Sequence, residues 1–333
     1  MNELSKHPDI IVIGASAGGV TALQRIIGAL PHDLPAAVFA VLHISAESKG
    51  LLAPLLARQS AVPVETAVDG QPIRRGHVLI APPDRHLTLD KDSVRVTLGP
   101  PQNRHRPSVD VLFRSAAIQH GPRVIGVVLT GFLYDGTAGL RAIKDYGGIS
   151  VVQDPATADV PGMPESALRH VEVDHVVPLA QISQLLVRLT AGTQNGTRAM
   201  ERANLHRFEA EADLGNVHDL EKHAKPSSFL CPDCGGGLWE LREGTTRYRC
   251  RVGHGYTIDD LSESQDELVE SALWAATRSL EDRAAISRRI AEEWRVRKAE
   301  QMAEHFERRG QESAEHATTL RKLLGVPKAS DTG

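Results

Sequence analysis

The sequence predicts an α/β fold built on a doubly wound, mainly parallel sheet in a three-layer α/β/α arrangement, followed by two smaller regions. Short runs rich in valine and isoleucine recur through residues 9–190, and amphipathic stretches separate them. This alternation is typical of a parallel sheet that helices cover on both faces. Beyond residue 190 the pattern stops, every cysteine lies within 229–256, and no glycine or proline occurs between Tyr256 and Arg309.

The individual elements follow from these runs. Strands are expected where Gly, Pro or Asp bound an apolar run, at 10–13, 37–42, 77–80, 94–98, 124–129, 149–152 and 173–177. Helices are expected at 20–30, 51–58, 109–119 and 138–146. The segment 85–102 indicates a small hairpin attached to the sheet.

Four regions are therefore expected. Residues 1–190 form the sheet domain, and 191–228 form a linker with room for one short helix, because this stretch shows no sustained period. Residues 229–256 form a compact cysteine-bearing module. Apolar spacings of three, four and seven predict a helical hairpin or coiled coil over 257–325, with Gly310 as a break before the last helix.

Composition excludes several classes of protein. Apolar residues make up 41% of the 333 residues, too many for a disordered chain, and the net charge of −4 argues against a nucleic-acid partner. No apolar stretch approaches the ~20 residues that span a bilayer, so no membrane insertion is expected. The polar start does not resemble a signal peptide, and three cysteines are too few for a disulfide framework. A cytoplasmic protein is expected.

Residues 14–19, with the sequence GASAGG, match the G-x-S-x-G turn between a strand and a helix. Such a turn projects a serine hydroxyl above the end of a sheet, and the following helix offers N–H groups that suit an oxyanion. Ser16 is therefore a candidate nucleophile. Two other interpretations stay open: a phosphate-binding loop, which would need glycine at position 16, and a tight turn without chemistry.

A serine nucleophile needs a base and an acid that orients the base. His43 follows the expected strand 37–42, and Asp135 follows the expected strand 124–129. Both therefore belong to the carboxyl edge of the sheet, where ligands of open α/β sheets gather. The chain order Ser–His–Asp differs from that of the α/β-hydrolases and disfavours that superfamily.

The motifs together resemble the catalytic domain of the chemotaxis protein-glutamate methylesterases of the CheB type. The matching segments, in family order, are IVIGASAGG (11–19), VLH (41–43), IAPPDRH (80–86), RPSVDVLF (106–113), TG and DG (130–131 and 135–136) and GMP (162–164). The resemblance implies Ser16 as nucleophile, His43 as general base and Asp135 as the orienting acid. It also implies hydrolysis of glutamate methyl esters on a methylated receptor or receptor-like protein, a related glutamine deamidation, and no catalytic cofactor.

The sequence departs from the family pattern in three places. Family members usually carry a phospho-receiver domain before the catalytic domain, whereas the first expected strand here begins at residue 10, so control by such a domain is expected to be absent. Ala17 replaces the usual threonine after the serine. The motif Thr-Gly-Met-Gly-x-Asp-Gly becomes TGFLYDG, in which Phe132, Leu133 and Tyr134 predict a bulkier, more apolar lip beside the nucleophile.

The cysteine-bearing module has the spacing C-x₂-C-x₁₅-C-x₃-H, formed by Cys231, Cys234, Cys250 and His254. Four such ligands suit tetrahedral zinc, and a closed set of four favours a structural role over a catalytic one. The sequence therefore predicts a zinc-ribbon-like module whose metal supplies folding energy. The alternative is three ordinary thiols and an unrelated histidine.

The ribbon's arginines and the long helices suggest contacts rather than chemistry. Arg242, Arg247, Arg249 and Arg251 are expected to pair with the acidic start of the next helix, at Asp259, Asp260, Glu263, Asp266 and Glu267. The helices are expected to form a homodimer or to dock a signalling partner.

A protein-glutamate methylesterase is the leading function. The alternative is a catalytically impaired scaffold that binds a methyl-accepting partner.

Overall fold

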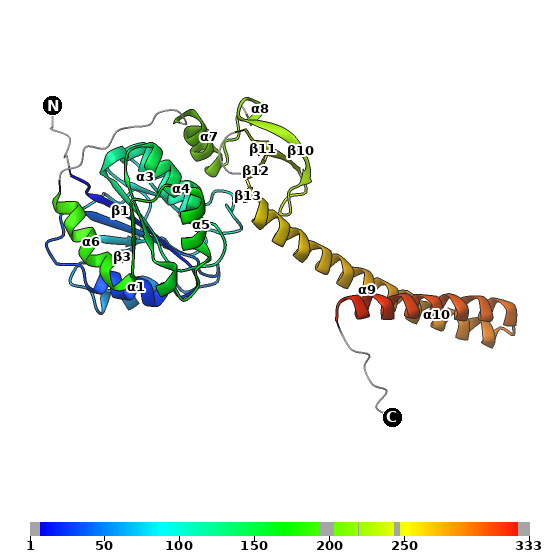
Figure 1. Cartoon of the computed structure of the whole chain (residues 1–333). Coiled ribbons are helices and arrows are strands. Elements are labelled where there is room, and N and C mark those ends of the chain that lie inside the picture. Colours follow the sequence, from blue (N-terminus) through cyan, green and yellow to red (C-terminus); the bar gives the residue numbers. More distant parts are fainter. Residues whose placement is uncertain (1–6, 193–202, 219, 243–246, 326–333) are drawn as a thin grey trace. The chain divides into compact units, whose positions relative to one another are not determined.

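The computed structural model describes residues 7–192, 203–218, 220–242 and 247–325 (Figure 1). It divides into two compact units, Met1–Asp260 and Leu261–Gly333, and each is described by itself. Among the described helices, none combines the length and the apolar character that a membrane span needs.

A seven-stranded sheet forms the centre of the first unit, in the order β3-β4-β2-β1-β7-β8-β9, and all its pairings are parallel. The strands are β1 (Ile10–Ala15), β2 (Ala37–Leu42), β3 (Val64–Thr66), β4 (Val78–Ile80), β7 (Val124–Val128), β8 (Ile149–Gln153) and β9 (His175–Val177). The doubly wound parallel sheet expected from the sequence is confirmed, and the short edge strand β3 is an addition to it.

Helices cover both faces of this sheet (Figure 1). They are α1 (Gly19–Gly28), α2 (Leu52–Ala57), α3 (Val109–His120), α4 (Thr137–Asp145), α5 (Gly162–His170) and α6 (Leu179–Ala191), and two single 3₁₀ turns are η1 (Gly121–Arg123) and η2 (Pro155–Thr157). Alternate side chains of β1 enter two different cores: Ile11 and Ile13 pack with α1, α2 and α6, whereas Ile10 and Val12 pack with α3, α4 and α5. Helices α5 and α6 are additions to the expected elements.

The chain order creates a switch point at β1. Strand β2 pairs with β1 on one side, and β7, more than eighty residues later, pairs with it on the other. Crevices form at the carboxyl ends of strands that diverge in this way. The residues that directly follow β1, β2 and β7 therefore meet at one edge of the sheet.

Strands β5 (His86–Leu89) and β6 (Val94–Thr97) form a separate antiparallel hairpin. This confirms the small hairpin expected within 85–102. Leu87, Leu89 and Val94 bury their side chains in the same core as α3, which attaches the hairpin to the sheet domain.

A second sheet follows the sheet domain, in the order β10-β11-β12-β13 with antiparallel pairings. Its strands are β10 (Ala224–Leu230), β11 (Gly237–Leu241), β12 (Arg247–Cys250) and β13 (Gly255–Thr257), and we call residues 224–257 the ribbon. Before it come α7 (Ala203–Asp213) and α8 (Leu220–His223), within the stretch expected as a linker. Leu205 and Phe208 of α7 are buried against Leu220 and Leu241, so α7 packs on the ribbon.

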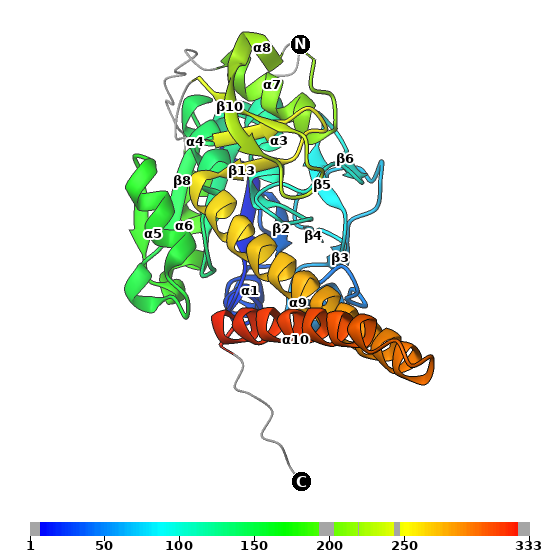
Figure 2. The same cartoon turned by 90° about the vertical axis from the view of Figure 1, so that its right-hand side faces the viewer.

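The second unit holds most of α9 (Ile258–Val296) and all of α10 (Glu300–Leu323), which lie side by side as a hairpin (Figure 2). Arg321 Nη2 lies 2.7 Å from a carboxylate oxygen of Glu281, and Arg295 pairs with Glu307. The expected break at Gly310 is wrong, because Gly310 lies inside α10 and the turn comes at 297–299. A Cβ at Gly310 would lie 3.3 Å from the Ala284 carbonyl oxygen, so the glycine permits close packing of the helices.

Candidate catalytic site and cysteine cluster

Ser16 lies in the tight turn between β1 and α1, at the switch point. Its backbone N–H donates to the carbonyl oxygen of Thr130 at 2.9 Å, which ties the turn to the end of β7. Gly18 has φ of 77°, a conformation that glycine adopts without steric cost. A Cβ at Gly131 would lie 2.7 Å from Ser16 Cβ, so only glycine allows this close approach.

His43 follows β2 directly and forms a buried pair with Asp135. Its Nε2 lies 2.7 Å from Asp135 Oδ2, and the two side chains are only 5% and 1% exposed. The backbone N–H of His43 donates to the Ala15 carbonyl oxygen at 3.1 Å. The structure therefore brings two of the three expected catalytic residues into contact and places the histidine beside the strand end that carries Ser16.

A dense set of donors surrounds the carboxylate of Asp135. Besides His43, it accepts hydrogen bonds from Asn103 Nδ2 at 3.0 Å, from Ser108 Oγ at 2.9 Å and from the backbone N–H groups of Val109, Asp110 and Gly136. Burial by itself raises the pKa of Asp135, but the hydrogen bond and charge of His43 and the other donors outweigh burial and hold this pKa below its ordinary value. Asp135 is thus an ionised, fixed acceptor.

Two side-chain polar atoms at the switch point have no hydrogen-bond partner among the described residues. One is the buried Nδ1 of His43, and the other is the hydroxyl oxygen of half-buried Ser16. The structure therefore does not join Ser16 to His43 by a hydrogen bond. Catalytic hydrogen bonds are often long in proteins without substrate, and the free Nδ1 is the histidine atom left to receive a proton.

The N-terminus of α1 lies directly beside Ser16. Gly18 is the cap residue, and no side chain caps the helix. Within the described residues, the backbone N–H groups of Ala17 and Gly18 donate no hydrogen bond to the protein. Free N–H groups at a helix N-terminus attract negative charge, so this turn is suited to hold an oxyanion.

The lip expected beside the serine is present. Phe132 is 61% exposed one residue after Gly131, and Leu133 adopts φ of 64°. Residues that carry a Cβ rarely adopt this left-handed conformation, because it crowds the Cβ against the backbone. The loop passes close to Gly162, where a Cβ would lie 3.1 Å from Leu133 N. An apolar side chain therefore stands at the rim of the site.

Three residues of the site were not predicted in these roles. Asn103 and Ser108 hold Asp135, and His105 stacks on His43 with ring centroids 3.6 Å apart. Only Ser108 lay within a motif noted in the sequence. Asn103 and His105 lie in an irregular segment without periodicity, and their proximity to Asp135 depends on tertiary structure.

Asp110, at the start of α3, is a second buried carboxyl group next to Asp135. Its Oδ1 accepts from the N–H groups of Gly136 and Gly139, and its Oδ2 accepts from Asn103 Nδ2. Burial, followed by the negative charge of Asp135, raises the pKa of Asp110 to about 7. The two neighbouring carboxyl groups thus have pKa values shifted in opposite directions.

The structure gathers the four predicted metal ligands. The ligand atoms of Cys231, Cys234, Cys250 and His254 all lie within 4.8 Å of one another. Cys234 Sγ and Cys250 Sγ are 3.7 Å apart, and His254 Nδ1 lies 3.5 Å from Cys231 Sγ and 3.4 Å from Cys250 Sγ. Zinc–sulfur bonds of about 2.3 Å in a tetrahedron separate two sulfur atoms by about 3.8 Å, so these residues fit a zinc ion.

The ribbon's arginines contact partners other than those expected. Arg247 pairs with Glu209 and Arg249 with Asp213, both acids lying on α7, and Arg251 Nη2 lies 2.7 Å from Glu221 Oε1 on α8. Arg242 donates to the carbonyl oxygen of Ala224. The expected pairing is therefore wrong for Asp259 and Asp260, which lie in the same unit as the ribbon, and it stays a prediction for Glu263, Asp266 and Glu267. The acids on α7 lie in the stretch expected as a linker, where the sequence shows no sustained period that points to them.

The doubly wound sheet and its switch-point site place the chain among the α/β proteins that carry a site at the carboxyl edge of a parallel sheet. Residues 11–186 match the CheB methylesterase family, and this match covers more than half of the 333 residues. The chain belongs to the CheB methylesterase family. The resemblance seen in the motifs is confirmed.

Curated relatives match the same part of the chain. A protein-glutamate methylesterase/protein-glutamine glutaminase 2 of Anaeromyxobacter dehalogenans is 46% identical over 182 residues, which are 55% of this chain and 53% of the relative. A putative enzyme of the same kind from Leptospira interrogans is 40% identical over 54% of this chain and 94% of its own length. The chain thus spans about half the length of the first relative and nearly all of the second.

A solved structure agrees with these matches. The crystal structure of the Thermotoga maritima CheB methylesterase catalytic domain aligns with a TM-score of 0.53 and 36% sequence identity. The alignment covers 54% of this chain and 98% of that one. The likeness is thus to a catalytic domain, and it covers about half of this chain.

Proposed function

We propose that the chain is a serine carboxylesterase that removes methyl esters from glutamate side chains of a receptor-type protein. The observation that carries the proposal is the buried His43–Asp135 pair beside Ser16 at the switch point. The same three residue types occur where the family motifs match. The relatives' names support the substrate class, since they specify glutamate methyl esters and glutamine amides.

In the proposed reaction, Ser16 Oγ attacks the ester carbonyl carbon while His43 Nδ1 takes the hydroxyl proton. Asp135 accepts the Nε2–H of His43, which fixes the tautomer and stabilises the imidazolium. The N–H groups of Ala17 and Gly18 stabilise the oxyanion. The C–O bond to methoxide breaks and methanol leaves with the proton from His43. Water then attacks the acyl-serine in the same way and releases glutamate.

We further propose that Cys231, Cys234, Cys250 and His254 hold a structural zinc ion. All four positions of a tetrahedral ion are filled by protein atoms, which leaves none for substrate. The ion would stabilise the ribbon, whose side chains form only a small apolar core. Metal analysis of the purified chain, expected to give one zinc per chain that is lost in Cys250→Ser, tests this proposal.

The role of α9 and α10 stays a prediction. Leu268, Val269 and Ile286 are 44%, 57% and 59% exposed on α9, so apolar surface is available for a second copy or a signalling partner. Sedimentation velocity on the full chain and on Ile286→Asp tests whether the helices join copies. An unchanged monomer in both would contradict the homodimer.

Methanol release from a methylated receptor fragment tests the proposed function. We expect release by the intact chain and a loss of about 10³-fold or more in Ser16→Ala, because removing a nucleophile leaves only binding and oxyanion stabilisation. Ser48→Ala, at an exposed serine, is the matched control. A folded chain that releases no methanol would favour the scaffold, as would equal rates for Ser16→Ala and the intact chain.

A further inference from the structure

A single tight turn, residues 102–105, contacts both the candidate catalytic pair and the ribbon. Gln102 N donates to His105 O at 3.1 Å, and His105 N donates to Gln102 O at 2.9 Å. The two central residues, Asn103 and Arg104, have φ values of 49° and 65°. Positive φ at both central positions defines a type I′ turn, which residues other than glycine adopt only at a cost. Contacts outside the turn must therefore stabilise it.

On one side, those contacts come from the ribbon. The side-chain amide of Gln102 donates to the carbonyl oxygen of Gly253 at 2.8 Å, and Asn103 N donates to the carbonyl oxygen of Gly255 at 2.9 Å. Gly253 and Gly255 flank His254, one of the four candidate metal ligands. A Cβ at Gly255 would lie 2.2 Å from Gln102 Oε1, so the side chain of Gln102 approaches the backbone of Gly255 at a distance that only glycine permits.

On the other side, the turn contacts the Asp135–His43 pair. Asn103 Nδ2 donates to Asp135 Oδ1 at 3.0 Å and to Asp110 Oδ2 at 2.9 Å. The imidazole of His105 stacks on that of His43 with an interplanar angle of 17°. Two side chains of one turn thus fix the acid and the base, while a third side chain holds the ribbon.

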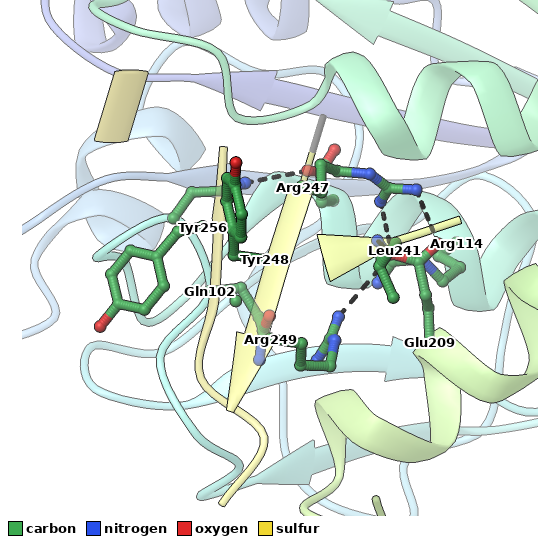
Figure 3. A pocket seen from close by; sticks show the side chains of 11 residues that line it. Gln102, Arg114, Glu209, Leu241, Arg247, Tyr248, Arg249 and Tyr256 are labelled. Atoms are coloured by element: carbon green, nitrogen blue, oxygen red, sulfur yellow. Dashed lines mark hydrogen bonds and ion pairs between the residues drawn. The ribbon is translucent and has the colours of Figure 1, made fainter. Parts of the chain in front are cut away.

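A buried ionic cluster fixes the ribbon beside this turn. Arg114 of α3 pairs with Asp213 of α7, and Arg249 of the ribbon pairs with the same carboxylate at 3.1 Å. Arg114, Arg247 and Arg249 also surround Glu209 of α7 (Figure 3). Arg249 also donates to the Gly253 carbonyl oxygen at 3.0 Å, the same oxygen that accepts from Gln102. The side chains of Arg114, Asp213 and Arg249 are at most 3% exposed. The metal-binding turn 250–254 is therefore linked to α3 as well as to the 102–105 turn.

We propose that the metal-loaded ribbon positions the Asp135–His43 pair through Gln102 and Asn103, so that esterase activity depends on the ribbon's metal. This inference rests on the proposed function. The ion would join Cys231 and Cys234 to Cys250 and His254. Without it, the positions of the Gly253 and Gly255 carbonyl groups depend on the hydrogen bonds of the turn and of Arg249, which do not connect the two halves of the ligand set. The 102–105 turn then relaxes, and Asp135 and His43 lose the contacts from Asn103 and His105.

The first test replaces Gln102 by methionine, which keeps the length of the side chain and removes the donor to Gly253. Gln184→Met, at an exposed position of α6, is the matched control. Activity is measured on p-nitrophenyl acetate, which needs no receptor docking. For Gln102→Met we expect a kcat at least 10-fold lower with KM changed less than 2-fold, and a shifted acid limb of the pH profile of kcat. Zinc content and melting temperature are measured on the same samples.

The second test removes zinc from the full chain with a chelator and a thiol reagent, then restores it. We expect kcat to fall with the zinc released and to recover on adding zinc and reductant. The readout independent of activity is the low-field proton NMR signal of the His43 Nε2–H that binds Asp135. It is assigned by its absence in Asp135→Asn, and we expect it to broaden or shift in the zinc-free chain and in Gln102→Met.

The outcomes separate the inference from the function on which it rests. If the intact chain hydrolyses no ester, the proposed function fails, whereas the NMR signal still reports whether the ribbon positions the pair. If the intact chain is an esterase, and Gln102→Met retains its kcat, pH profile and low-field signal, the inference is overturned. Should the zinc-free chain unfold altogether, Gln102→Met with bound zinc decides the matter.

Discussion

His105 stacks on His43, with ring centroids 3.6 Å apart. Burial, followed by the charge of His43, lowers the pKa of His105 to about 4. His105 is therefore neutral near neutral pH. When His43 takes the serine proton in the proposed reaction, the ring stacked on it is uncharged. The stack orients the base without placing two positive charges side by side.

This stack predicts a pH dependence of stability. The unfolded chain binds a proton at His105 below its ordinary pKa of 6.5, whereas the folded chain does so only near pH 4. The contribution of His105 is complete above pH 6.5 and is lost as the pH falls toward 4. In His105→Phe, which keeps a ring, we expect the free energy of unfolding to decline less between pH 7 and 4.5. Urea titrations measure this, with exposed His32→Phe as control. Parallel declines in His105→Phe and the intact chain would contradict it.

Asp135→Asn tests the acid of the pair. An amide cannot hold the correct tautomer of His43, and we expect kcat to fall by about 10⁴-fold. Because hydrogen bonds lower the pKa of Asp135, its contribution to stability is complete above the unfolded pKa near 3.8 and is lost as the pH falls further. The stability difference between Asp135→Asn and the intact chain should therefore shrink below pH 4. Asp33→Asn, at an exposed site, should change neither quantity.

Phe132→Ala tests the apolar lip. The exposed ring is available to the proposed protein substrate. Burying an aromatic side chain contributes about 1.5–3 kcal/mol, or about 10-fold or more in binding. We expect a higher KM for a methylated receptor fragment and an unchanged kcat for p-nitrophenyl acetate. Phe229→Ala, an exposed phenylalanine of the ribbon, is the control. An equal loss of kcat on both substrates would place Phe132 in the catalytic step instead.

The ionic cluster beneath the ribbon predicts unequal effects of two substitutions. Three guanidinium groups, of Arg114, Arg247 and Arg249, face two carboxylates, of Asp213 and Glu209. Asp213→Ala leaves three buried cations with one carboxylate and should cost about 3–5 kcal/mol of unfolding free energy. Arg114→Met leaves two cations with two carboxylates, and we expect a much smaller cost. Urea denaturation compares the two variants, and equal costs would show that charge balance does not govern this cluster.

The sheet domain could be predicted because short, continuous segments of the sequence determine its strands and its turns. Buried strands such as β1 and β2 are continuous apolar runs, and the turn around Ser16 has its own glycine pattern. Ser16, His43 and Asp135 each follow such a strand, so topology alone brings them to one edge. The spacing of the cysteines likewise predicts four ligands of one metal ion without reference to the rest of the fold.

The remaining features depend on contacts between distant residues. Helix α7 has a mixed, charged surface, and its acids are buried only because Arg114, Arg247 and Arg249 surround them. Gly310 suggested a break, yet packing against Ala284 keeps it inside α10. The 102–105 turn shows no periodic pattern from which it could be predicted. Its conformation depends instead on contacts with the ribbon, which lies more than a hundred residues later in the sequence.

The distance in sequence between the 102–105 turn and the ribbon also sets an order of assembly. A ribosome makes the chain from its N-terminus, and all strands of the seven-stranded sheet are complete by residue 177. The turn gains its ribbon contacts only after Gly255 has been synthesised. A nascent chain can therefore fold its sheet while the 102–105 turn is still unsupported, and the turn reaches its final conformation only after residue 255 has been made.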